Sequence, residues 1–102
     1  MIVVIATIEV HENKREAFLA EFHKVVPLVR AEAGCLEYFP NTDFAADLPI
    51  PVASRPNVVT IVEKWESFAA LKTHLGAPHM AEYRVRVKDL VVGVQLQILQ
   101  PA

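Results

Sequence analysis

The sequence of 102 residues has one cysteine, three glycines and no long uninterrupted hydrophobic run. A single cysteine, Cys35, excludes an internal disulfide and a metal site built from cysteines alone. The scarce glycines form no glycine-rich phosphate loop. No apolar run approaches the roughly 18 residues that a membrane span requires. The first ten residues, MIVVIATIEV, lack the basic start of a signal peptide, so we expect a cytoplasmic protein.

The sequence also lacks an excess of positive charge. Its formal net charge is −2, whereas a nucleic-acid-binding domain usually carries a basic face. A short basic cluster at Arg84, Arg86 and Lys88 is flanked by Glu82 and Asp89. This mixture of charges is typical of a solvated helix face and predicts no nucleic-acid partner.

Hydrophobic residues, in contrast, are abundant and make up 53% of the chain. A chain of this length has room for one domain, which we place at 1–102. Because so small a domain leaves much of its surface exposed, we expect part of the apolar area to be covered by a partner subunit.

The spacing of these residues predicts strands at 2–10, 35–41, 58–65 and 92–99. A helix is expected between the first two strands, begun by a capping box of Asn13 and Glu16 and ended by Gly34. Its apolar residues recur every three or four positions: Phe18, Phe22, Val25, Val26 and Val29.

A second helical segment follows the third predicted strand. Ser67 is a suitable N-cap, Gly76 can end the helix in a left-handed conformation, and Pro78 can begin another helix that reaches about Leu90. The resulting order, βαββαβ, predicts a ferredoxin-like α+β fold in which helices cover one face of a four-stranded antiparallel sheet.

The other face of the sheet is also expected to be apolar, because Val3 and Ile5 alternate with the core residues of the first strand. We therefore predict a homodimer in which two sheets pack face to face as a dimeric α+β barrel.

A long connection at 41–56 contains three prolines and four large apolar residues. The length predicts a functional loop, and the apolar residues suggest that it folds back on the domain as a lid or pocket wall. Phe44 is the aromatic residue of this loop and a candidate substrate contact.

The candidate chemistry gathers around one strand–helix–helix corner, which holds Glu63, Trp65, His74 and His79. A helix break separates the two histidines and no third ligand has a standard spacing, so we predict no metal site. Each residue also has a purely structural interpretation. A single tryptophan often packs in a core, His74 can cap or pack, and a buried Glu63 can bond across a subunit interface.

Four short motifs carry a resemblance to a known family: AGCLxY at 33–38, ExWES at 63–67, ALxxHL at 70–75 and PHM at 78–80. On these motifs the chain resembles the antibiotic biosynthesis monooxygenases, small ferredoxin-like dimers. Within that family it is most similar to the bacterial quinol monooxygenases that act on menadiol-like substrates. The similarity extends over essentially the whole chain.

The resemblance implies oxygenation of an electron-rich aromatic compound, such as a quinol, without flavin, haem or metal. His74 or His79 would then act as the general base, since an imidazole titrates near neutral pH. Trp65 and Tyr83 would hold the aromatic ring, and Arg84 or Tyr38 would lie near developing negative charge.

Three other functions remain open from the sequence. Some relatives of this fold degrade haem, but Thr7 and His74 stand where those proteins carry an asparagine and a tryptophan, and these departures argue against that function. Isomerisation or hydrolysis of a small metabolite would use the same histidines without consuming O2. A non-enzymatic dimer that sequesters quinones is the third alternative.

Overall fold

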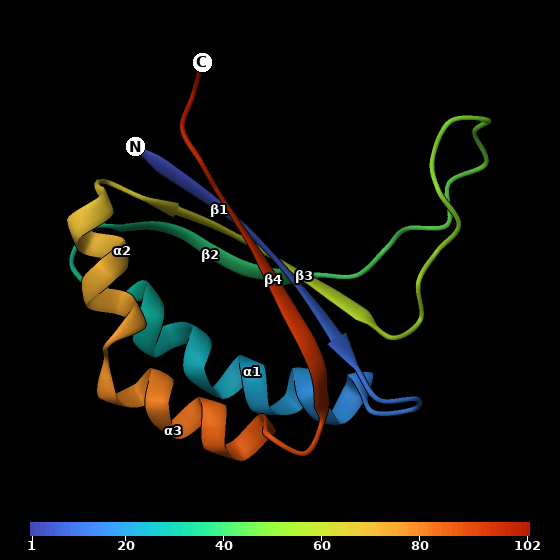
Figure 1. Ribbon diagram of the computed structural model, residues 1–102, viewed down its shortest axis with the longest axis horizontal. Coiled ribbons are helices and arrows are strands. Elements are labelled where there is room, and N and C mark those ends of the chain that lie inside the picture. Colours follow the sequence, from blue (N-terminus) through green and yellow to red (C-terminus); the bar gives the residue numbers. More distant parts are fainter.

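The computed structural model describes residues 1–102, which form four strands and three helices (Figure 1). In chain order these are β1 (Ile2–Val10), α1 (Arg15–Arg30), β2 (Cys35–Asn41), β3 (Val58–Trp65), α2 (Phe68–Leu75), α3 (Pro78–Val87) and β4 (Val91–Leu99). The predicted strand positions are confirmed, apart from β4 beginning one residue earlier.

The strands form one antiparallel sheet in the order β2-β3-β1-β4, and all three helices lie on the same side of it (Figure 1). This is the predicted ferredoxin-like α+β fold. The register places Val4 of β1, Glu63 of β3 and Tyr38 of β2 in one row across the sheet. Because side chains alternate along a strand, all three point to the helix-covered side.

The core lies between the sheet and α1. Along β1, every second residue from Val4 to Val10 is buried, as the alternating pattern predicts. All five predicted core residues of α1 are also buried: Phe18, Phe22, Val25, Val26 and Val29. The aromatic rings of Phe22 and Tyr38 stack with centroids 5.5 Å apart, which joins α1 to β2.

The predicted capping box at the start of α1 is wrong. Asn13 has a φ of 64°, Lys14 occupies the N-cap position, and no side chain caps the helix. Asn13 instead lies in the turn closed by the bond from the Lys14 amide to the His11 carbonyl. Asparagine tolerates the left-handed region, so the tight turn accounts for its presence here.

The two glycines near helix ends also differ from expectation. Gly76 has a φ of −97° and not a left-handed conformation, and its amide bonds to carbonyls of the last turn of α2. Helix α1 ends at Arg30, before Gly34, whose φ is +83°. A Cβ on Gly34 would lie 2.7 Å from the Cβ of Ala70, so this glycine permits close approach of α2.

The start signals of α2 and α3 are confirmed. The Ser67 hydroxyl accepts a hydrogen bond from the Ala70 amide at 3.1 Å, and Pro78 is the first residue of α3. Helix α3 ends at Val87, somewhat before the predicted Leu90, which packs at the edge of the core. These signals fix the orientation of α2, the helix that carries His74.

The loop between β2 and β3 does not fold back on its own domain, so that prediction is wrong. It projects beyond the sheet at the end away from α2, and Phe44 and Ile50 are 88% and 91% exposed (Figure 1). Asp43 accepts two hydrogen bonds from the Arg55 guanidinium, at 2.7 and 3.0 Å, and Arg15 donates to the Arg55 carbonyl. These contacts tie the base of the loop together and leave its apolar tip in solvent.

The face of the sheet opposite the helices is open and carries the half-buried side chains of Val3, Ile5 and Val62. Strand β4, at the edge, is exposed along nearly its whole length. No helix of the structure has the length and apolar character needed to span a membrane.

Candidate active site

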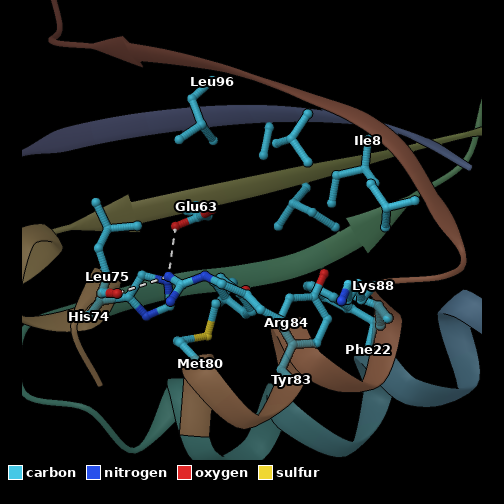
Figure 2. A pocket seen from close by; sticks show the side chains of 16 residues that line it. Ile8, Phe22, Glu63, His74, Leu75, Met80, Tyr83, Arg84, Lys88 and Leu96 are labelled. Atoms are coloured by element: carbon cyan, nitrogen blue, oxygen red, sulfur yellow. Dashed lines mark hydrogen bonds and ion pairs between the residues drawn. The ribbon is translucent and has the colours of Figure 1, made fainter. Parts of the chain in front are cut away.

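A cavity of about 450 Å³ lies between the helix-covered side of the sheet and helices α2 and α3 (Figure 2). Its volume is in the range of small-molecule sites. Twelve of its 16 lining residues are hydrophobic, among them Ile8, Met80 and Leu96. An apolar cavity of this size with few polar groups suits a flat aromatic ligand.

Two polar side chains, Glu63 and His74, face one another at this cavity. Figure 2 shows Glu63 pointing from β3 toward the imidazole of His74 on α2. Both are buried, with only 6% of Glu63 and 1% of His74 exposed. Oε1 of Glu63 lies 3.8 Å from Nε2 of His74, a separation beyond hydrogen-bond range.

Glu63 is held by its neighbour on the same strand face. The indole Nε1–H of Trp65 donates a 3.0 Å hydrogen bond to Oε1 of Glu63. Burial raises the pKa of Glu63 to about 7, although the Trp65 bond acts in the opposite direction and nearby Glu32 adds to the increase. Glu63 therefore exchanges its proton near neutral pH, where most carboxyl groups are fully ionised.

The ring of His74 is oriented by a second carboxylate. Its Nδ1 lies 2.8 Å from Oε2 of Glu32, a residue of the turn between α1 and β2. As a carboxylate, Glu32 can only accept, so Nδ1 carries the proton and Nε2 presents a lone pair on the Glu63 side. The ring is further held between Trp65 and Tyr38, with centroids at 4.6 and 5.5 Å.

Burial lowers the pKa of His74, while the hydrogen bond to Glu32 acts in the opposite direction. The burial effect is the larger, so the imidazole is neutral at neutral pH. A neutral, oriented imidazole whose free nitrogen faces an apolar cavity has the properties of a general base.

His79 is placed differently from His74. Its Nε2 lies 2.8 Å from the same Oε2 of Glu32, but its side chain is 22% exposed and does not line the cavity. Both histidines thus donate to one carboxylate oxygen. The structure brings together the two histidines that the helix break separates in sequence, and only His74 faces the cavity.

Among the other predicted site residues, Tyr38, Tyr83 and Arg84 line the cavity. Burial raises the pKa of both tyrosines, so their hydroxyls stay protonated. Arg84 donates a 2.8 Å hydrogen bond to the carbonyl of Leu75, which fixes its guanidinium at the rim. Trp65 is fully buried behind Glu63 and His74 and does not line the cavity.

Phe44 lies in the exposed loop and does not line the cavity of its own chain. Sequence analysis missed Glu32, whose partners are 42 and 47 residues away along the chain. Glu32 lies in an irregular turn, where hydrophobic periodicity carries no signal. No group of three or more His, Cys, Asp or Glu side chains has a geometry that could hold a metal ion.

Comparison with known proteins agrees with this fold. The family model described as antibiotic biosynthesis monooxygenase matches residues 1–86. The chain belongs to the antibiotic biosynthesis monooxygenase family. The predicted family membership is thereby confirmed.

The chain is similar to several individual proteins of known sequence or structure. It is 40% identical to the probable quinol monooxygenase YgiN of Escherichia coli, over 99% of this chain and 98% of that protein. It is 35% identical to the putative monooxygenase YcnE of Bacillus subtilis, over 89% and 86% of the two chains. The crystal structure of PA3566 from Pseudomonas aeruginosa superposes with a TM-score of 0.81 at 27% identity, covering 99% and 93%.

Proposed function

We propose that this monooxygenase-family protein oxidises a quinol with O2 and needs no cofactor to do so. The observation that carries the proposal is the free Nε2 of His74, which faces an apolar cavity while Nδ1 is held by Glu32. The similarity to a relative named as a probable quinol monooxygenase supports the choice of substrate class.

The substrate itself can supply the electrons. Removal of a hydroxyl proton by His74 makes the quinol a strong electron donor, and O2 then adds to a ring carbon. The balance is quinol + O2 → hydroxyquinone + H2O. One electron pair comes from oxidation of quinol to quinone, and the other comes from the C–H bond that becomes C–OH.

The cavity provides what this chemistry requires of a protein. Its apolar wall can bind the ring and admit O2, and the buried imidazole can accept the proton. Arg84 at the rim is placed to stabilise negative charge on the second oxygen of the ring. His79 bonds to Glu32 but does not line the cavity. We therefore assign His79 to positioning this carboxylate and His74 to the role of base.

The test is O2 uptake with menadiol as substrate, with incorporation of ¹⁸O from ¹⁸O2 into the quinone product measured by mass spectrometry. We expect one labelled oxygen in the product. Replacing His74 with Asn should lower kcat by about 100-fold or more, because general-base catalysis contributes 10²–10⁴-fold. His23→Gln, on the exposed side of α1, is the matched control and should leave the rate unchanged.

An unaltered protein that binds menadione but takes up no O2 with menadiol would contradict the proposal and favour a quinone-sequestering role. Turnover of a small metabolite without O2 uptake would favour an isomerase. A Soret band on titration with haem would reopen haem degradation, although Thr7 lies on the sheet face opposite the cavity.

We further propose a homodimer formed through the open sheet face, where Val3, Ile5 and Val62 are apolar and only half-buried. In such a dimer the projecting loop can reach the partner, and only in this form do we retain Phe44 as a substrate contact. Light scattering should give twice the chain mass of 11.4 kDa, and Ile5→Lys should reduce it to the mass of one chain. A single-chain mass for the unaltered protein would contradict this arrangement.

A further inference from the structure

The carboxyl group of Glu63 has no part in the reaction as described so far, yet it faces the free Nε2 of the proposed base, His74. The 3.8 Å between Oε1 of Glu63 and Nε2 of His74 is too long for a direct hydrogen bond. It is short enough that one oxygen atom between them can lie within hydrogen-bond distance of both. The two side chains thus form a gap for a single reacting oxygen at the cavity wall.

The surroundings of Glu63 favour a neutral carboxyl group. Within the sheet it is flanked by Val4 and Tyr38, and the structure gives it no ion pair with a lysine or arginine. Its one hydrogen-bond donor is Trp65, a neutral group. The titratable or charged side chains around the cavity are Tyr38 from β2, His74 from α2, Tyr83 and Arg84 from α3, Lys88 just after α3, and Glu32, which bonds to His74.

Oxygenation of a quinol requires an acid as well as a base. Once O2 has added to the ring carbon, the outer oxygen of the peroxide must leave as water. Hydroxide is a poor leaving group in an apolar cavity, so a proton must reach the outer oxygen as the O–O bond breaks. His74 has already taken up a proton, but a second donor beside it lets both transfers occur without rearrangement.

We propose that Glu63 is the acid that protonates the departing peroxide oxygen and that it regains its proton from His74. This inference rests on the proposed quinol monooxygenase function. His74 first takes the hydroxyl proton of the quinol, and the anion combines with O2 to form a C–O bond. Glu63 then donates its proton to the outer oxygen.

The remaining steps restore the site. The O–O bond breaks as the ring carbon loses its hydrogen as a proton, and the outer oxygen leaves as water after taking up this second proton. The electron pair of the C–H bond completes the reduction of the oxygen. Glu63, now a carboxylate, recovers a proton from the His74 imidazolium across the 3.8 Å gap, either directly or through the water formed. Both residues end as they began.

The decisive variant is Glu63→Gln, which keeps the shape of the side chain and an oxygen that can accept from Trp65. Without the acid, the peroxide should leave the ring carbon before the O–O bond breaks, giving quinone + H2O2. With menadiol as substrate, we expect O2 uptake to continue while formation of hydroxyquinone falls by about 100-fold. The H2O2 released per O2 consumed should approach one.

Glu16→Gln, on the exposed side of α1, is the matched control and should release as little H2O2 as the unaltered protein. Glu63→Asp should partly restore coupling, because it returns a carboxyl group at a shorter reach. A merely structural role for Glu63 would not shift the products from water to H2O2. In the unaltered protein, hydroxyquinone formation should decline above neutral pH as Glu63 loses its proton, and this decline should be absent in Glu63→Gln.

Hydroxyquinone formation by Glu63→Gln at the rate and coupling of the unaltered protein would overturn this inference. That result differs from failure of the proposed function, in which the unaltered protein itself consumes no O2 with menadiol. If Glu63→Gln does not fold, Glu63→Asp provides the test. Its shorter side chain should raise the H2O2 released per O2 consumed above that of the unaltered protein. An unchanged H2O2 yield would contradict an acid that depends on the 3.8 Å gap to His74.

Discussion

The corner around His74 and the loop at 42–57 depart from the usual distribution of side chains in opposite ways. At the corner, two carboxyl groups, two imidazoles and an indole are withdrawn from water, and each has a polar partner. In the loop, large apolar side chains such as Phe44 and Ile50 remain in water. Buried polar groups and exposed apolar groups are both informative exceptions.

The corner around His74 and the loop differ in how far contacts within the single chain account for their side chains. The corner is already assembled, because every polar group finds its partner within the chain. The apolar side chains at the loop tip remain exposed in the single chain, and in the dimer we propose they would meet the partner subunit. The two regions should therefore respond in opposite ways to substitution, and the predictions below test that contrast.

The largest effect is expected for Glu63→Gln on stability as a function of pH. The pKa of Glu63 is about 7 in the folded chain, against an ordinary value of 4.5 for a glutamate side chain in the unfolded chain. Below pH 4.5 both states are protonated, and between these values only the unfolded state loses its proton, so folding stability falls as pH rises. At about 1.36 kcal/mol per pKa unit, the free energy of unfolding falls by about 3 kcal/mol over this interval.

Glu63→Gln should therefore match the unaltered protein near pH 4 and exceed it by about 3 kcal/mol at pH 8.5, where the buried carboxylate is destabilising. Urea unfolding at both pH values measures this difference. Equal stability of the two proteins at pH 8.5 would show that Glu63 is solvated in the folded chain.

A smaller effect is expected for Glu32→Gln, which removes the charge that orients His74. Partners that orient a functional histidine typically contribute about 10–100-fold to activity in metal sites, and we expect a fall in kcat within this range. His79→Gln should have a smaller effect still, since Glu32 keeps its bond to His74. Steady-state O2 uptake ranks the two, and a larger loss for His79→Gln would reverse our assignment of the base.

The cap of α2 should contribute less again. Ser67→Ala removes the hydroxyl that accepts from the Ala70 amide and should cost about 1 kcal/mol of unfolding free energy. The matched control is Ser54→Ala in the exposed loop, where the cost should be near zero. Comparable losses in the two variants would mean that the loop is ordered by contacts absent from the single chain.

The smallest effect is expected for Phe44→Ala. Because this ring is 88% exposed, its removal should change the unfolding free energy by less than about 0.5 kcal/mol. Phe18→Ala, the same change at a fully buried position, should cost about 3–5 kcal/mol. If dilution below the dimer dissociation constant abolishes any cost of Phe44→Ala seen at high concentration, the loop packs against a partner.

The elements of the fold could largely be predicted from the sequence, because each rests on local spacing. Alternation in β1 and the three-to-four spacing in α1 identified the core, and Ser67 and Pro78 marked where α2 and α3 begin. The errors at Asn13 and Gly76 concern residues that suit several conformations. At these positions tertiary contacts, and not local preference, decide which conformation is adopted.

The site could be predicted only in part. The motifs around Trp65 and Pro78 pointed to the corner where the cavity lies, but they could not distinguish the positions of His74 and His79. That separation depends on Glu32, whose distance from both histidines is set by packing between a turn and two helices. The extended course of the loop was missed because its apolar residues predicted packing against the domain, whereas the contacts of Asp43 and Arg55 hold only its base.

Gly34 has a consequence for the recognition of related enzymes. Because Gly34 has no side chain, the turn that bears Glu32 can lie against Ala70 of α2. Ala70 lies about one helical turn before His74. Any larger residue would displace that helix and lengthen the bond between the carboxylate and the imidazole. A protein that has the histidine but lacks this glycine would need another way to hold the imidazole against the carboxylate. We therefore expect the glycine and the histidine together to mark this carboxylate–imidazole geometry better than either residue alone.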